Sequence, residues 1–258
     1  MRKSFLTILI LASLTCQGQS IQSYFNYGKT TDFRSIKLVL ESTTQTTFYN
    51  ANNIEKKKEI TSYNDHNNAV VELRYNEDTT LKQRLIRTYD STGVRCLVKT
   101  FENWHPILGH RVETTFNEYD AKGTLNTITE KGPRNNIIRQ TKIINNEKGN
   151  PIELTMYFEN QIQGKEIASY NYEKNEVTIS YFNSYNEIIN TQTVTIEPNK
   201  SQEGDIVNEN GDIIKSKNYQ KEIKYDKYGN WIKEVYSVIK NGKKIKKSES
   251  TRSIKYRK

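Results

Sequence analysis

Two histidines five residues apart come closest to the spacing of a metal site. His105 and His110 stand in "NWHPILGH", around Pro106 and Gly109. Some zinc sites use such a spacing when cysteines or a third ligand accompany the pair. No such partner is adjacent, so we interpret the segment as a hairpin loop that contains two histidines. His66 lies in a predicted turn and is interpreted as a turn residue.

Catalytic chemistry has less support. Cys96 could pair with a histidine as thiol and base, but a cysteine in a strand is more simply a core residue. Glycoside hydrolysis needs two carboxylates about 5 to 9 Å apart, and 30 scattered acidic residues single out no pair. The sequence has no phosphate-binding Gly-rich loop, HExxH or GxSxG. We expect a protein without enzymatic activity or cofactor, with a glycan-active hydrolase as the alternative.

Aromatic side chains are the first candidates for binding, because their faces could stack on sugars or bases. A structural interpretation is favoured, since in a thin sheet a tyrosine supplies apolar area while its hydroxyl reaches water. The candidate surface aromatics are Trp231, Tyr225, Tyr236 and Tyr181.

The C-terminal stretch is the second candidate. Of the net charge of +9, residues 240–258 carry +8 and the first three residues +2, which leaves −1 for the body. Clustered lysines could bind a polyanion such as lipopolysaccharide, acidic polysaccharide or nucleic acid. They could equally protect the edge of an open sheet from aggregation, which is the favoured interpretation. The candidate polyanion contacts are Lys243, Lys244, Lys246 and Lys247.

Short strands must position these residues. In "EVTISYF" (176–182) β-branched and aromatic side chains alternate between two sides, which is typical of strands. Helical spacing is sustained nowhere for more than two turns. We predict an all-β antiparallel meander of hairpins with roughly 14 to 16 strands, forming an elongated, twisted or partly rolled sheet. A closed β-barrel is the alternative; against a membrane barrel, Arg84 and Arg87 fall on opposite faces of one strand.

Turn-like clusters repeat along the chain, mostly about 26 residues apart as measured between their fifth positions. Each has polar residues at its start and Gly or Asn at the fifth position. The longest gap has room for one more turn, at 172–177. The clusters are "YNDHNNA" (63–69), "YDSTGVR" (89–95), "YDAKGTL" (119–125), "NNEKGNP" (145–151), "FNSYNEI" (182–188), "VNENGDI" (207–213) and "YDKYGNW" (225–231).

The residue types suit a three-residue hairpin loop, in which a type I turn is followed by a left-handed residue that Gly or Asn tolerates. An Asp or Asn before the loop can accept backbone N–H bonds. In the last cluster Asp226 would lie opposite Asn230, and Tyr225 would pair with Trp231. The residues assigned to the repeat turns are Asp90, Gly93, Asp120, Gly123, Gly149, Gly211, Asp226 and Gly229.

The same construction predicts the cross-strand pairs next to the other turns. Most of these pairs are apolar, but Tyr89 with Arg95 and Asn145 with Pro151 depart from that pattern. The apolar pairs are Tyr119 with Leu125, Val207 with Ile213, Phe182 with Ile188 and Tyr63 with Ala69.

Tyr-Asp followed by Gly at this spacing resembles the YD repeats of Rhs-type bacterial surface and toxin proteins. Degenerate units such as "VNENGDIIKSKNY" are also similar to the MORN-variant hairpin repeats of secreted bacterial proteins. The resemblance implies consecutive β-hairpins and extracytoplasmic placement. For some members it implies carbohydrate binding or enclosure of a toxin. Four of the seven units lack the Asp.

The N-terminal residues 1–18 have the layout of a secretory signal peptide, with Arg2 and Lys3 before an apolar run and Gly18 near the expected cut. A lipoprotein signal with Cys16 as the lipid-bearing residue is the alternative. The rest, residues 19–258, is predicted to be one hairpin-repeat domain ending in a basic strand at 240–258. We expect an exported protein of the periplasm, the outer-membrane surface or the medium. It would present a binding surface to an envelope glycan or a protein partner, or serve a purely structural role.

Overall fold

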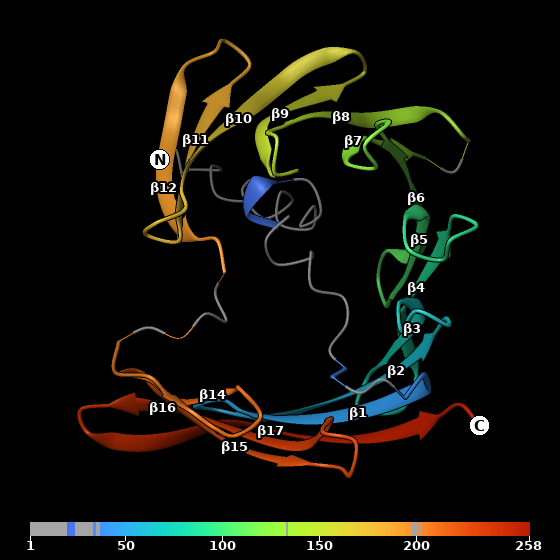
Figure 1. Ribbon diagram of the computed structural model, residues 1–258. Helices are drawn as coiled ribbons and strands as arrows, with labels where there is room; N and C mark the ends of the chain where they lie inside the picture. Colours follow the sequence, from blue (N-terminus) through green and yellow to red (C-terminus); the bar gives the residue numbers. More distant parts are fainter. Residues whose placement is uncertain (1–19, 24–32, 35–36, 133, 198–200, 202) are drawn as a thin grey trace, which may run out of the picture. The chain divides into compact units, whose positions relative to one another are not determined.

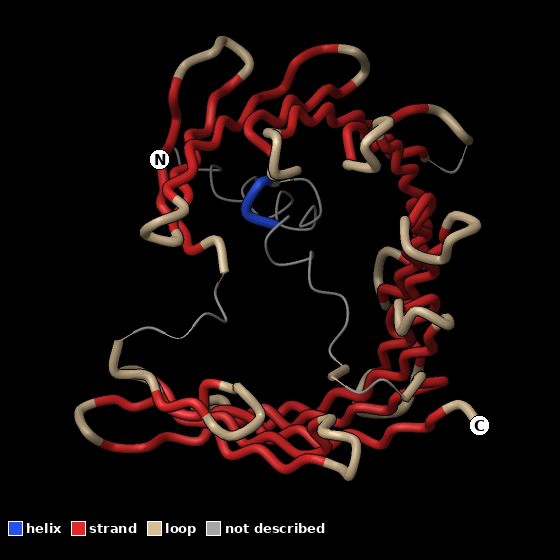
Figure 2. The backbone as a smooth tube through the Cα atoms, in the orientation of Figure 1, coloured by secondary structure: helices blue, strands red, loops and turns tan. Residues whose placement is uncertain are grey.

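The computed structural model describes residues 20–23, 33–34, 37–132, 134–197, 201 and 203–258 (Figure 1). The predicted signal peptide (1–18) and Cys16 lie outside the described residues. In the described ranges the helical content is one turn, residues 21–23 (Figure 2). These ranges contain no helix whose length and hydropathy would let it cross a membrane.

The protein is all-β, as the alternating pattern predicts, and has more strands than expected. The strands are β1 (Val39–Tyr49), β2 (Ile54–Tyr63), β3 (Ala69–Tyr75), β4 (Leu81–Tyr89), β5 (Cys96–His105), β6 (Gly109–Tyr119), β7 (Leu125–Lys131), β8 (Ile137–Asn145), β9 (Pro151–Phe158), β10 (Gln161–Asn171), β11 (Glu176–Asn183), β12 (Ile188–Thr195), β13 (Ile206–Val207), β14 (Ile213–Lys215), β15 (Tyr219–Tyr225), β16 (Trp231–Lys240) and β17 (Lys243–Tyr256).

The meander prediction is confirmed, because antiparallel pairing joins strands that follow one another in the chain. This holds from β1 to β6, from β8 to β12 and from β13 to β17. The described strands also show a pairing between strands far apart in the chain: β1 pairs with β17, from Val39 opposite Tyr256 to Phe48 opposite Ser248. No local pattern in the sequence predicts that pairing.

The chain divides into two compact parts. In the described residues the smaller part comprises 20–23, 119–128 and 139–196, and the larger part comprises 33–34, 37–118, 129–138 without 133, and the residues from 197 on. The larger part orders its strands from β13 to β17 and then from β1 to β6. Neither part is closed into a barrel in the described strands, so the closed-barrel alternative is not supported.

The smaller part has an apolar core on one face of its sheet. Ile143, Leu154, Ala168, Val177 and Ile179 are buried there. Ile21, from the single helical turn, packs into the same cluster and is fully buried. The core therefore depends on a segment just after the predicted leader.

The larger part buries few large apolar side chains and several polar ones. Its buried polar residues include Ser42, Thr61, Glu102, Asn117 and Arg252. Buried polar groups must be hydrogen-bonded to be tolerated. The ladder and side-chain hydrogen bonds therefore matter more in this part than an apolar core.

Candidate binding surface

The repeat turns have the predicted backbone conformation. All seven fifth positions have positive φ: Asn67, Gly93, Gly123, Gly149, Asn186, Gly211 and Gly229. At the last turn the Asp226 N–H donates to the Asn230 carbonyl (2.9 Å) and the Gly229 N–H to the Asp226 carbonyl (3.1 Å). The Asp226 carboxylate accepts from the N–H groups of Tyr228 and Asn230.

The register beside these turns matches the expectation at five of them and departs from it at one, while the pair of Tyr119 with Leu125 stays a prediction. Tyr225 pairs with Trp231, and the apolar pairs next to the turns at 63–69, 182–188 and 207–213 are present. Asn145 lies opposite Pro151. Tyr89 pairs with Cys96, so the predicted pairing with Arg95 is wrong. The physical reason is a longer loop, in which the Asp90 N–H donates to the Arg95 carbonyl.

A tyrosine from the next hairpin joins the two ends of several turns, an arrangement we call the tyrosine clasp. The Tyr256 hydroxyl donates to the Asp226 carboxylate and accepts from the Asn230 amide (2.8 Å). Tyr225 in the same way contacts Asn208 (2.7 Å) and Asp212.

Two other turns carry related contacts. The Tyr172 hydroxyl accepts from the amides of Asn146 (2.8 Å) and Asn150 (3.0 Å). At the turn 64–68 the backbone carbonyl of Gly93 takes the tyrosine's place, accepting from Asn64 and Asn68. The turns are therefore linked from one repeat to the next, and the polar residues of the repeated motif hold the sheet together.

The four candidate aromatics are engaged within the fold. Arg252 Cζ lies 3.7 Å from the centroid of the Trp231 ring, so the guanidinium covers one face of that indole. The Tyr236 ring lies 5.9 Å from the ring of Tyr219. Tyr181 is half-buried, and its hydroxyl bonds Gln192. A sugar-stacking role for these aromatics stays a prediction.

The four candidate lysines divide into two pairs. Lys244 and Lys246 form ion pairs with Glu222 and Glu249, and both lysine side chains remain about two-fifths exposed, at 41% and 40%. Lys243 and Lys247 are exposed. Lys243 alternates with Lys244 and therefore faces the other side of the strand, and Lys247 lies at a register shift.

Cross-strand register brings further lysines to the face of Lys244 and Lys246, because directly paired residues share a face. One row across the strands β2, β1, β17, β16 and β15 reads Lys58, Gln45, Thr251, Lys233 and Lys224. The next row reads Lys56, Thr47, Glu249, Val235 and Glu222.

Lys56, Lys58, Lys224, Lys233, Lys244 and Lys246 define what we call the basic face. Only two of them come from the basic C-terminal stretch. The "KKK" run in β2 is the signal that could have pointed to Lys56 and Lys58.

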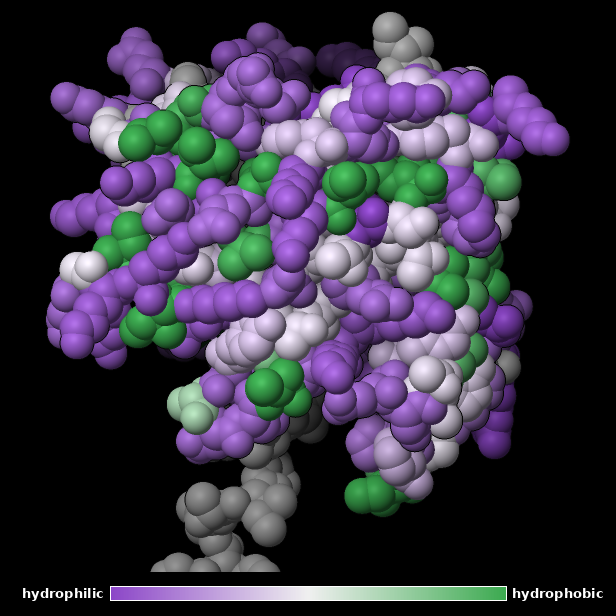
Figure 3. Space-filling view, turned by 90° about the horizontal axis from the view of Figure 1, so that it is seen from below, coloured by the Kyte–Doolittle hydropathy of each residue, from purple (hydrophilic) through white to green (hydrophobic). Residues whose placement is uncertain are grey.

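Glu249 organises the centre of the basic face. Lys233 and Lys246 each approach its carboxylate to 2.5 Å. Their hydrogen bonds lower the pKa of Glu249 to about 2, so it stays ionised at any physiological pH. It fixes two ammonium groups side by side, while Lys56, Lys58 and Lys224 lie two strands away on the same face. Figure 3 shows the side on which β15 to β17 lie, with hydrophilic side chains over most of it and hydrophobic ones in separate patches.

The edge-protection interpretation of the C-terminal lysines applies only in part. Residues 248–251 of β17 pair with both β1 and β16, so that stretch is internal. Residues 243–246 extend past Phe48, the last β1 residue paired with β17, and pair with β16. The lysines of this extension can therefore discourage edge pairing and also face a ligand.

A charged cluster lies on β4, β5 and β6. The Glu102 carboxylate, in a residue only 7% exposed, accepts from Arg84 Nη2 (2.6 Å) and contacts His110 Nε2 (3.1 Å). These hydrogen bonds, that of Arg84 above all, lower the pKa of Glu102. The Trp104 ring stacks on His110 at 4.7 Å between centroids. The carboxylate is held by two partners from neighbouring strands, which suits a structural tie.

The two histidines of "NWHPILGH" do not converge. His105 Nδ1 accepts the backbone N–H groups of Ile107 and Leu108, both at 3.2 Å, and so closes the hairpin loop. His110 lies in β6 and contacts Glu102 instead. The described ranges hold no group of three His, Cys, Asp or Glu placed to hold a metal ion.

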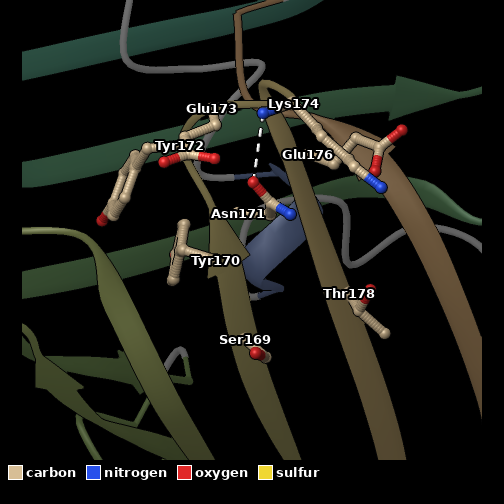
Figure 4. A pocket seen from close by; sticks show the side chains of 8 residues that line it. All are labelled: Ser169, Tyr170, Asn171, Tyr172, Glu173, Lys174, Glu176 and Thr178. Carbon is tan, nitrogen blue, oxygen red and sulfur yellow. Dashed lines mark hydrogen bonds between the residues drawn. The ribbon is translucent and has the colours of Figure 1, made fainter.

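A hollow of about 640 Å³ lies at the turn between β10 and β11 (Figure 4). Tyr170 and Tyr172 stack at 5.5 Å and point away from Glu176 and Thr178. Lys148 Nζ lies 3.7 Å from the centroid of the Tyr172 ring. The other residues that line the hollow are polar. The tyrosine rings are already in contact with each other, and that of Tyr172 also with Lys148.

No protein-family model and no curated protein matches the chain. Among solved structures it is similar to a porin-like protein from Bacteroides uniformis, with 11% identity and a TM-score of 0.44 over 88% of this chain and 100% of that one. A porin-like protein from Bacteroides vulgatus matches at 11% identity and a TM-score of 0.29, over 85% of this chain and 99% of that chain. A chain of the TcdB2-TccC3-Cdc42 crystal structure matches at 12% and 0.34; the match covers 80% of this chain and 14% of that one.

Proposed function

We propose that the chain is an exported, non-enzymatic repeat protein whose basic face binds an anionic glycan of the cell envelope. The observation that carries this proposal is the cross-strand register, which gathers six lysines from β2, β15, β16 and β17 on one face. Two of them, Lys233 and Lys246, are held next to each other by Glu249. An ion pair that leaves its lysines two-fifths exposed keeps them available to a further anion.

The spacing suits an extended, repeating anion. Neighbouring strands lie about 4.8 Å apart, so Lys224 and Lys233 present charges about one strand spacing apart, while Gln45 and Thr251 separate Lys233 from Lys58. A flat face of this kind matches a polymer that carries acidic groups along its length, and it does not enclose a small molecule. Hydroxyl and amide side chains, Thr251 and Gln45 among them, stand between the lysines as hydrogen-bonding partners for sugar hydroxyls.

The test is binding to immobilised dextran sulfate, with uncharged dextran as the reference, at several salt concentrations. The triple variant Lys58→Gln, Lys244→Gln, Lys246→Gln removes three charges of the basic face. At about 1 kcal/mol for each basic residue near an anionic surface, its affinity should fall about 100-fold at low salt. The slope of log affinity against log salt should become shallower.

The matched control removes three exposed lysines of the smaller part, by Lys122→Gln, Lys142→Gln and Lys174→Gln. It changes the net charge by the same amount and should bind dextran sulfate nearly as the unaltered protein does. Equal losses in both variants would show attraction by net charge without a defined face. Full binding by the first variant would overturn the proposal.

A further inference from the structure

A buried carboxylate in the smaller part faces the backbone nitrogen of Ile21. The Ile21 nitrogen lies 2.8 Å from Glu166 Oε2, which accepts its N–H. Ile21 is fully buried and Glu166 is 4% exposed. Glu166 lies on β10 and Ile21 in the single helical turn, 145 residues apart in the chain. The contact therefore fixes the start of the described chain against the middle of a sheet.

One amide hydrogen bond is a weak partner for a carboxylate in such a place. A buried charge costs several kcal/mol unless an opposite charge and further hydrogen bonds compensate for it. Burial raises the pKa of Glu166 to about 7 while the Ile21 N–H lowers it only in part. The group facing Glu166 across the β10–β11 pairing is Tyr181, which is not a cation at any pH. Neither the Ile21 N–H nor Tyr181 supplies the positive charge that would compensate the buried carboxylate of Glu166.

The sequence in front of Ile21 offers a source for that charge. Leader peptides are cut after a pattern of small residues at the third and first positions before the bond. Gly18, which lies outside the described residues, and Ser20 occupy those two positions for the bond between Ser20 and Ile21. Cleavage there would place a new amino group on the very nitrogen that already contacts Glu166.

We propose that a leader peptidase hydrolyses the Ser20–Ile21 bond and that the new α-ammonium of Ile21 forms a buried ion pair with Glu166. In this hydrolysis the water oxygen joins the Ser20 carbonyl carbon, so Ser20 leaves with a free carboxylate. The Ile21 nitrogen keeps its hydrogen and gains the two protons of the water to become the ammonium. The contact of Ser20 Oγ with the Ser23 N–H (3.0 Å) is lost with the leader. The ion pair replaces a single neutral donor by a cation, which attracts the Glu166 carboxylate more strongly. Cleavage would therefore hold Ile21 more firmly in the apolar core.

The direct experiment is mass spectrometry of the N-terminal peptide of the exported, mature protein. The result expected is a chain that begins at Ile21. A chain that begins at Gln19, the product of the cut near Gly18, or at a lipid-modified Cys16 would overturn the proposal.

A second experiment separates the ion pair from the choice of cleavage site. Two purified forms, one beginning at Ile21 and one at Gln19, are released from cleavable fusions and melted at pH 7. The Ile21 form should have the higher melting temperature, and Glu166→Gln should abolish the difference between the two forms. Equal melting temperatures in the unsubstituted pair would refute the ion pair even if the leader is cut at Ile21.

Discussion

Replacing Tyr256 by phenylalanine removes the hydroxyl that joins the two ends of the turn 226–230. That hydroxyl donates to the Asp226 carboxylate and accepts from the Asn230 amide. A hydrogen bond to a charged group contributes about 1.5 to 3 kcal/mol, and a buried amide left without its acceptor costs about 1 to 3 kcal/mol. Asn230 is 1% exposed, so solvent cannot easily replace the lost partner. We expect Tyr256→Phe to lower the free energy of unfolding by about 2 to 3 kcal/mol.

The assay is urea unfolding followed by far-UV circular dichroism, with Tyr228→Phe as the matched control. The Tyr228 ring lies 4.6 Å from the Tyr256 ring, and its hydroxyl makes no hydrogen bond with the described residues. The control should stay within about 0.5 kcal/mol of the unaltered protein. If both variants unfold alike, the tyrosine clasp contributes nothing and the interpretation of the repeat motif is wrong.

The same clasp predicts a dependence on alkaline pH. Burial and the hydrogen bond to Asp226 raise the pKa of Tyr256 from 10 to about 12. A raised folded-state pKa gives stability that is complete below the unfolded value of about 10 and is lost as the pH rises towards 12. The difference in unfolding free energy between the unaltered protein and Tyr256→Phe should therefore narrow between pH 10 and pH 12. A difference that stays constant over this range would contradict the assignment.

Three further changes test other contacts. Gly229→Ala should destabilise the protein by about 1 kcal/mol, because φ is +79° there, whereas Gly229→Asn should cost less; thermal melting compares them. Arg84→Met should cost about 1 to 3 kcal/mol, because it removes the arginine partner of the Glu102 carboxylate. Arg74→Met breaks an exposed pair with Glu59 and a pair with Glu72, which keeps Arg87 as a partner, so it should cost under about 1 kcal/mol in urea unfolding. The pKa of Glu102 is lowered from 4.5, so the Arg84 contribution should be present at neutral pH and fade as the pH falls through and below 4.5. Glu249→Gln frees two lysines of the basic face and should tighten binding to dextran sulfate several-fold; weaker binding would contradict the role given to that face.

The turns could be predicted because their chemistry is local. A residue with positive φ must be Gly or Asn in most cases, and all seven fifth positions satisfy that rule. Other turns were missed: at Thr79 the residue type gives no such signal, but at Asn135, Asn160 and Asn241 it does. The longer loop after Asp90 shows that one inserted residue is enough to shift a register.

The long-range contacts could not be predicted in the same way. Pairing between β1 and β17 uses backbone groups that every residue has, so sequence does not mark it. Arg252 covers Trp231 because β17 lies beside β16, not because of any spacing within the chain. The sequence does contain a sign of the tyrosine clasp, because a tyrosine recurs shortly before several turns. Only the fold shows that the hydroxyl of this tyrosine bonds the side chains of the preceding turn.

The pairing of β1 with β17 also sets the order of folding events during synthesis. The Thr46 and Ser250 hydroxyls that meet across these strands are 204 residues apart in the chain. Contacts of such separation form only after the later segment is available, and they slow folding. A ribosome that still holds β17 prevents this pairing. The larger part can therefore complete its sheet only after β17 has left the ribosome, and until then the β1 edge that pairs with it stays open.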